Sequence, residues 1–111
     1  MIQGKNLQSL DVLKPDYQGD LDSEQAVHRL HKTVKGLVRS PTALEVRNAS
    51  QIGAQVSLVA YVGAREDVGP NDRVRVRDGR HAGEYAVIGE PLQPGGERGH
   101  LRLDLTRVTT R

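Results

Sequence analysis

One stretch decides the fold class: Asp72-Arg73-Val74-Arg75-Val76-Arg77-Asp78, in which polar and apolar residues alternate. A period of two places Val74 and Val76 on one face of a β-strand and the three arginines on the other. Residues 100–106 repeat the pattern, with three leucines at the inward positions. Both stretches therefore predict strands with one buried and one exposed face.

Working outward from this stretch, further strands are expected at residues 8–13, 33–39, 56–62 and 85–88. The last two are apolar on both faces, so we expect either that they are the most buried strands or that one face of each meets a partner. Gly/Pro-rich turns join strands at a spacing of 10–15 residues, which predicts an antiparallel sandwich or small barrel. Closure into a barrel would also remove exposed sheet edges. We therefore predict a single domain over residues 1–111: mainly β, a small antiparallel β-barrel.

Two segments do not fit the strand pattern. Residues 23–32 carry apolar side chains at helical spacing after a capping residue, Asp22, so a short N-terminal helix and an extended lead-in both remain open. Residues 40–53 predict a long, mostly polar inserted loop, in which Leu44 and Val46 form a brief central strand. A connection of this length in a small domain is typical of a functional or disordered segment.

Composition excludes several classes of protein. The 111 residues contain no cysteine, which excludes disulfides, zinc–thiolate sites and thiol nucleophiles. No apolar run approaches about 18 residues and no signal region is present, so we expect a soluble protein with no membrane partner. Sixteen basic residues against 14 acidic ones give a net charge of +2, too small to indicate nucleic-acid binding by itself.

The sequence predicts no catalytic chemistry. His28 and His31 lie three residues apart, but no third ligand follows at a recognisable spacing. His81 and His100 lie beside turns, where surface positions are expected. No nucleophile elbow, phosphate-binding loop or paired carboxylates occur in a recognisable frame. We therefore expect no enzymatic activity, no metal and no cofactor.

Residues 69–88 resemble the KOW motif of SH3-like barrels in ribosomal proteins and transcription factors. The shared elements are an Asp-Arg-Val-x-Val strand at 72–76, a Gly-bounded turn and an apolar strand, although Tyr85 stands where that motif usually has glycine. This resemblance implies a module that binds RNA or the ribosome. Its contact surface would be the arginine row, Arg73, Arg75, Arg77 and Arg80; a solubilising face is the other interpretation of that row.

A longer resemblance follows the order of strands along most of the chain. Its pieces are the stretches 10–15, 33–40, 53–62, 72–79, 84–87 and 98–108, which read in part as Val-x-Gly-x-Val, Asp-Arg-Val-x-Val and Tyr-x-Val. In order, spacing and total length the chain is similar to head-to-tail stopper (head-closure) proteins of long-tailed bacteriophages and prophages. A tail terminator or another phage neck or tail protein is a further alternative of the same kind.

The stopper resemblance implies a β-barrel subunit of a homo-oligomeric ring of twelve in the virion neck, assembled from protein in the host cytoplasm. The ring would close the DNA channel beneath the portal and adaptor proteins and offer a surface to the tail proteins. Residues 40–53 would be the channel loop, which meets packaged DNA without sequence specificity through Arg39, Thr42, Glu45, Arg47, Asn48 and Gln51. Two further loops would contact partners through Arg65, Glu66, Asp67, Arg80 and His81.

Overall fold

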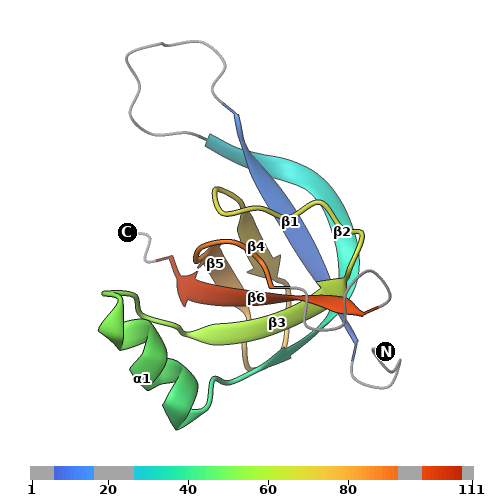
Figure 1. Cartoon of the computed structure of the whole chain (residues 1–111). Helices are drawn as coiled ribbons and strands as arrows, with labels where there is room; N and C mark the ends of the chain where they lie inside the picture. Colours follow the sequence, from blue (N-terminus) through green and yellow to red (C-terminus); the bar gives the residue numbers. More distant parts are fainter. Residues whose placement is uncertain (1–6, 17–26, 93–98, 109–111) are drawn as a thin grey trace.

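The computed structural model describes residues 7–16, 27–92 and 99–108. In chain order their elements are β1 (Gln8–Asp16), β2 (Val27–Arg39), α1 (Ala43–Gln51), β3 (Leu58–Gly63), β4 (Arg73–Val76), β5 (Gly83–Val87) and β6 (His100–Arg107). The strands form a closed antiparallel barrel in the order β1-β2-β3-β6-β5-β4 (Figure 1). The predicted small antiparallel β-barrel is therefore confirmed.

Strand β1 closes the barrel because it pairs with β2 on one side and with β4 on the other. Leu10 faces Val34 across the first pair and Val76 across the second. All three side chains are buried in the same cluster. The first strand of the chain is thereby joined to a strand more than sixty residues away.

The core is almost wholly aliphatic and follows the alternation seen in the sequence. Val74 and Val76 of β4 point inward, as do the three leucines of β6. Val68, in the connection between β3 and β4, adds to the same cluster. Tyr85 is its single aromatic member among the described residues, and the Tyr85 hydroxyl donates a hydrogen bond to the carbonyl oxygen of His81 at 2.7 Å. The expected burial is confirmed for β3, in which Leu58, Val59 and Ala60 are fully buried, whereas β5 has one buried face and Ala86 on the other face is only half-buried.

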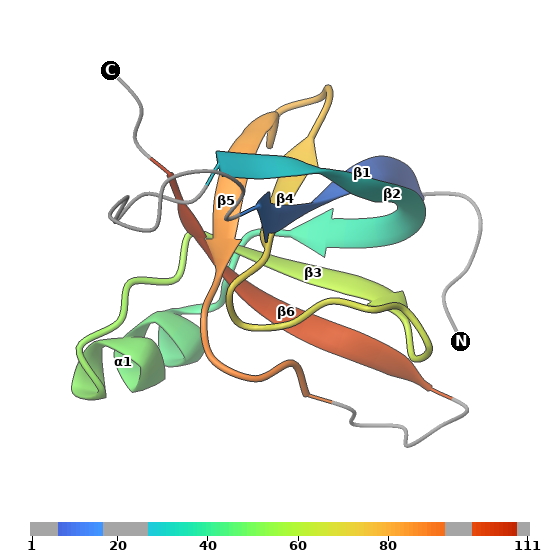
Figure 2. The ribbon, with the colours of Figure 1, turned by 90° about the horizontal axis from the view of Figure 1, so that it is seen from above.

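The β1–β2 hairpin is longer than the sequence predicts. Strand β2 begins at Val27, so residues 27–32 take the extended alternative and the N-terminal helix is not formed there; residues 23–26 lie outside the described part. Val12 pairs with Lys32 and Leu13 with Leu30, which leaves His31 as the extra residue of a bulge. The hairpin extends beyond the other four strands (Figure 1), and in the view from above it lies on the side of the barrel away from α1 (Figure 2).

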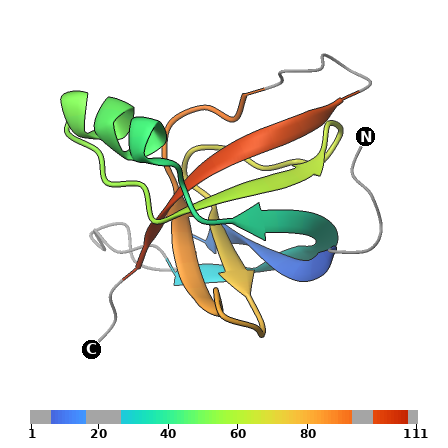
Figure 3. The same cartoon turned by 90° about the horizontal axis from the view of Figure 1, so that it is seen from below.

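Residues 40–53 are not the long loop with a brief central strand that the sequence predicts, because α1 occupies most of them. Thr42 caps the helix: its hydroxyl accepts a hydrogen bond from the Glu45 amide, and the Glu45 carboxylate accepts one from the Thr42 amide. This reciprocal pair starts a helix even without an apolar stripe. None of the side chains of α1 is buried, and the helix lies outside the barrel wall (Figure 3).

Gly36 marks the closest approach between strands. A β-carbon there would lie 2.6 Å from Leu10 Cδ1 and 2.7 Å from the carbonyl oxygen of Tyr61. Because one of these neighbours is backbone, it cannot move aside without distorting β3. Glycine at this position lets β2 lie close to both β1 and β3, at the point where β2 changes its pairing from one to the other.

We expect Gly36→Ala to lower the free energy of unfolding by about 1–3 kcal/mol, the usual range for overpacking. Urea denaturation measures the loss. Gly63→Ala is the matched control, because its β-carbon would meet the Glu66 side chain at ordinary distances of 3.6 and 4.0 Å. Equal stability of the two variants would contradict the proposed close approach.

Candidate functional site

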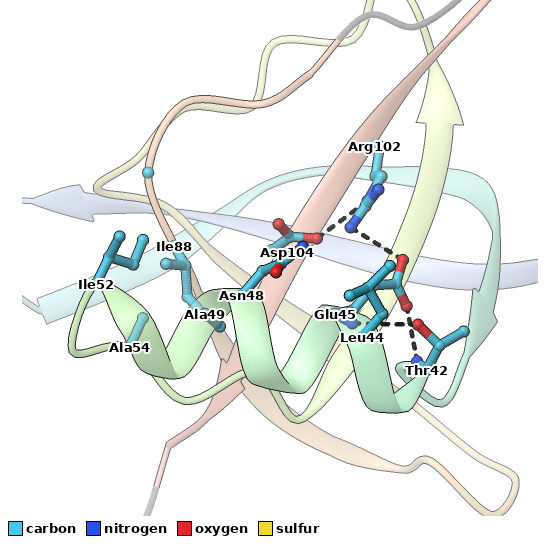
Figure 4. Close-up of a pocket in the computed structure, with 11 residues that line it drawn as sticks. Thr42, Leu44, Glu45, Asn48, Ala49, Ile52, Ala54, Ile88, Arg102 and Asp104 are labelled. Atoms are coloured by element: carbon cyan, nitrogen blue, oxygen red, sulfur yellow. Dashed lines mark hydrogen bonds and ion pairs between the residues drawn. The ribbon is translucent and has the colours of Figure 1, made fainter.

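A groove runs between α1 and the outer face of β6, with a volume of about 460 Å³ (Figure 4). Its wall on the helix side includes Leu44 and Ile52, whose exposed fractions are 62% and 78%. Ile88 and Gly89 line the other side, beyond the end of β5. A groove that leaves large apolar side chains in water is typical of an interaction surface rather than of a catalytic cleft.

Glu45 fastens the helix to the barrel at the end of this groove. Its carboxylate accepts two hydrogen bonds from the Arg39 guanidinium, at 2.7 and 2.8 Å, and lies 3.0 Å from Nη2 of Arg102. Arg39 also donates to the Tyr61 hydroxyl at 2.8 Å, and Arg102 donates to Asp104 at 3.2 Å. One half-buried carboxylate therefore links α1 to β2 and β6.

The electrostatics of this cluster favour the charged forms. The bidentate hydrogen bonds from Arg39 lower the pKa of Glu45 to about 2 against the opposing effect of burial, with further lowering by the Thr42 amide and by Arg102. Pairing with Glu45 raises the pKa of Arg39 in turn. Charge-assisted, bidentate contacts are among the stronger polar interactions in proteins. The cluster therefore attaches α1 firmly across the physiological pH range.

The structure divides the six residues expected to line a channel. Arg39, Thr42 and Glu45 come together at the attachment point of the helix, where their polar groups bond to one another. Asn48 lines the groove, whereas Arg47 and Gln51 lie exposed on α1. Arg39 is therefore a positioning residue of the helix, and Arg47 keeps an exposed positive charge.

The arginine row on β4 is paired with carboxylates. Arg73 contacts Glu84 at 2.7 Å, whereas Arg75 and Arg77 both contact Asp11. Asp11 points to the outer face of β1, yet its side chain is only 1% exposed beneath the two guanidinium groups. The hydrogen bonds from Arg77 lower the pKa of Asp11 to about 2, despite burial, and Thr33 and Arg75 add to the effect. Two carboxylates therefore face three arginines, so this row is only partly neutralised, and Arg80 lies exposed beyond it.

The two loops expected to contact partners lie apart from the groove. Glu66 pairs with Lys32 at 3.0 Å, and exposed Asp67 lies 3.6 Å from Lys14. The β3–β4 connection therefore contacts the β1–β2 hairpin through ion pairs. Arg65 is exposed. In the β4–β5 connection, Arg80 is exposed and His81 is half-buried. The candidate residues therefore form three separate surfaces, not one site.

Sequence reasoning missed three residues: Arg102 and Asp104, which line the groove, and Asp11, which lies outside it in the contact between β1 and the arginine row. Arg102 and Asp104 alternate with the leucines of β6, which marks them as outward-facing but gives no hint of α1 as their neighbour. Asp11 interrupts the apolar run from Leu10 to Leu13, and a lone carboxylate in such a run is a readable sign of a buried ion pair.

Among the described residues, no group of three or more His, Cys, Asp or Glu side chains is arranged to hold a metal ion. His28 Nε2 lies 3.1 Å from the carbonyl oxygen of Asn71, and the His100 ring packs edge-on against Tyr61 at 4.9 Å. Within the same ranges, no helix combines the length and apolar character needed to cross a membrane.

Comparison with known proteins yields a likeness of fold. No family model matches the sequence, and no curated protein is similar to it. The chain is similar to the solution structure of protein SF1141 from Shigella flexneri 2a, a structural genomics target, with a TM-score of 0.75 over 94% of both chains and 15% sequence identity. At this identity the likeness establishes a shared fold and carries no function.

We expect Glu45→Gln to loosen α1 while the barrel stays folded. Glutamine keeps an acceptor for the Thr42 amide but loses both charge-assisted contacts, which should weaken attachment by about 1–3 kcal/mol. Amide hydrogen exchange of residues 43–51 should then accelerate about 10- to 100-fold, with exchange in β3 and β6 unchanged. Arg47→Gln, at an exposed position of the same helix, is the control; equal acceleration in both variants would contradict the attachment role.

The Asp11 cluster predicts an acid-dependent loss of stability. Because folding lowers this pKa from 3.8 to about 2, ionisation of Asp11 stabilises the fold above about pH 4 and the effect disappears as the pH falls toward 2. Asp11→Asn should cost about 2 kcal/mol at pH 7, with a smaller difference from the parent protein at pH 2.5. Urea unfolding at several pH values measures this. Asp67→Asn, at a 78% exposed side chain, is the control; a pH-independent cost of Asp11→Asn would overturn the assignment.

Proposed function

We propose that this chain is a structural connector subunit of a phage neck, which assembles as a homo-oligomeric ring and joins a DNA-filled head to a tail. Two arguments support the proposal. The order of strands resembles that of head-closure proteins, and the closed barrel carries an insertion between β2 and β3, where those proteins have their channel loop. The paired state of Arg73, Arg75 and Arg77 makes RNA binding the weaker alternative.

The observation that carries the proposal is helix α1. It is fixed by Glu45, yet it leaves Leu44, Val46 and Ile52 exposed. Apolar side chains that are held in place outside a complete core are typical of a subunit whose neighbours cover them in an assembly. In this proposal a ring neighbour or the adaptor covers the groove, and α1 is a fixed projection instead of a flexible arm.

Contact with packaged DNA would then rest on exposed residues of α1. Because Arg39 is neutralised by Glu45, the cation available for phosphate contact on this segment is Arg47, with Asn48 and Gln51 as neutral hydrogen-bonding neighbours. Backbone phosphate contacts of this kind need no base recognition. Copies of α1 around a ring would narrow the channel and place one such arginine per subunit at its wall.

The proposal is tested by mixing the purified protein with its portal–adaptor complex and imaging the particles by electron microscopy. We expect an additional ring beneath the adaptor. Leu44→Ser with Ile52→Ser should prevent ring addition, because these side chains line the groove to be covered. Leu92→Ser is the matched control, since Leu92 is 51% exposed at a position outside the groove. Failure of the parent protein to add a ring would refute the connector role.

Deletion of residues 42–51 tests the channel role separately. Arg39 of β2 pairs with Val59 of β3, so the ends to be joined lie next to each other. The residues that remain between them after the deletion are therefore enough to connect the two strands. Since α1 contributes no buried side chain, the barrel should fold normally by circular dichroism. Particles completed with this variant should lose packaged DNA; retention of DNA would contradict a role of α1 in closing the channel.

A further inference from the structure

The β4–β5 connection contains a pair of residues, Asp78 and Gly79, whose chemistry the neck function does not use. It is the single Asp-Gly pair of the sequence, and no Asn-Gly pair occurs. Both residues are exposed, and Gly79 has a φ of +88°, in the region that favours glycine. Because glycine has no β-carbon, its amide nitrogen can closely approach the carboxyl carbon of the aspartate that precedes it.

The two reacting groups of this pair make no hydrogen bonds with the described residues. The Gly79 amide has no acceptor there, and the Asp78 carboxylate has no donor. Asp78 is held through its carbonyl oxygen, which accepts a hydrogen bond of 3.4 Å from the Gln8 side-chain amide. The neighbouring guanidinium of Arg77 donates to Asp11 at 2.8 Å. Both the nitrogen and the carboxyl group are therefore free to react with each other.

Other amide and carboxyl side chains of the described ranges lack this freedom. Asp67 is also exposed, but the amide that follows it, of Val68, donates to a carbonyl oxygen at 3.2 Å. Asn71 likewise precedes an amide in use, since the Asp72 nitrogen donates to a carbonyl oxygen at 3.1 Å. Asn48 lies inside α1, where helical hydrogen bonds hold the following amide. An intramolecular attack requires a free and well-placed nucleophile, which these three positions do not have.

We propose that Asp78 is a site of spontaneous succinimide formation, at which the folded protein converts aspartate to isoaspartate. The Gly79 nitrogen attacks Cγ of Asp78 and loses its proton, and one carboxyl oxygen leaves as water, which closes a ring. Water then adds to one of the two ring carbonyls. Addition at Cγ restores aspartate, whereas addition at the main-chain carbonyl of Asp78 leaves the chain running through Cγ, as isoaspartate. The sequence of steps needs no reactant besides water and does not depend on the neck function.

The modified residue would change the surface around it. Isoaspartate adds one carbon to the main chain between Arg77 and Gly79, and the carbonyl group that the Gln8 side chain contacts becomes a free carboxylate. The added carbon lies next to Arg77, whose guanidinium covers Asp11. The partner that fits this group is a methyltransferase that esterifies isoaspartate carboxylates with the methyl group of S-adenosylmethionine.

The test incubates the full-length protein near neutral pH over several weeks and labels samples with a purified isoaspartyl methyltransferase and tritiated S-adenosylmethionine. We expect labelling to rise with time, and electron-transfer fragmentation should place the isoaspartate at Asp78, with a minor species lighter by one water molecule. A peptide of residues 74–83 gives the rate without the fold, and the protein should react within about tenfold of it, because the turn leaves both groups free. A slower reaction than that, or no isoaspartate at Asp78, would overturn the proposal.

Variants separate this position from other aspartates. Asp78→Glu keeps the charge but makes ring closure much slower, because the ring gains a carbon, so labelling should fall about tenfold. Asp67→Glu is the matched control, a change of the same kind at a 78% exposed side chain, and should leave labelling unchanged. Asp78→Asn should raise labelling, since ammonia leaves an amide more readily than water leaves a carboxylate. Circular dichroism checks that each variant is folded. Equal labelling of Asp78→Glu and Asp67→Glu, or no increase in Asp78→Asn, would refute the assignment.

Discussion

The barrel closes where β1 lies between β2 and β4, and the side chains of β1 make contacts on both faces of the sheet. Leu10 and Val12 fill the interior, whereas Asp11 between them holds Arg75 and Arg77 on the outside. A chain without Phe or Trp builds its core almost wholly from aliphatic side chains, with Tyr85 as the aromatic member among the described residues. Wrapping the sheet on itself lets these side chains cover one another without a layer of helices. The position of α1 outside the wall follows from this, because the interior is already full.

Much of the charge of this protein is used within the fold. Asp11 and Glu45 each contact two arginines on other elements, and each has a lowered pKa because those arginines surround it. The guanidinium group suits this role, since it can bond one carboxylate with two donors. A count of basic residues therefore overstates what the surface offers to a partner. Exposed charged side chains are found on the β1–β2 hairpin, the β3–β4 connection, α1 and the β4–β5 turn.

Local pattern predicts the strands well and the pairs between them poorly. Strands β4 and β6 follow directly from alternation, since Val74 and Leu103 are each flanked by polar residues. The spacing of Thr42 and Glu45 is a readable helix start, but the residues that follow lack an apolar stripe, so periodicity indicates a loop. The contact between Asp11 and Arg77 joins positions 66 residues apart, and no local pattern specifies such a partner. Residues 27–32 fit both a helix and a strand, and pairing with β1 decides between them.

Strand β6 comes last in the chain but lies between β3 and β5 in the sheet. While a ribosome is still making residues 100–107, both neighbours have one unsatisfied side and the wall cannot be completed. The barrel therefore closes only after residues 100–107 have been made, and it closes through contacts of large sequence separation, which favour slow folding. During synthesis, unpaired strand edges are exposed for longer than in a helical protein of this size. Chaperones therefore have a longer interval in which to prevent aggregation.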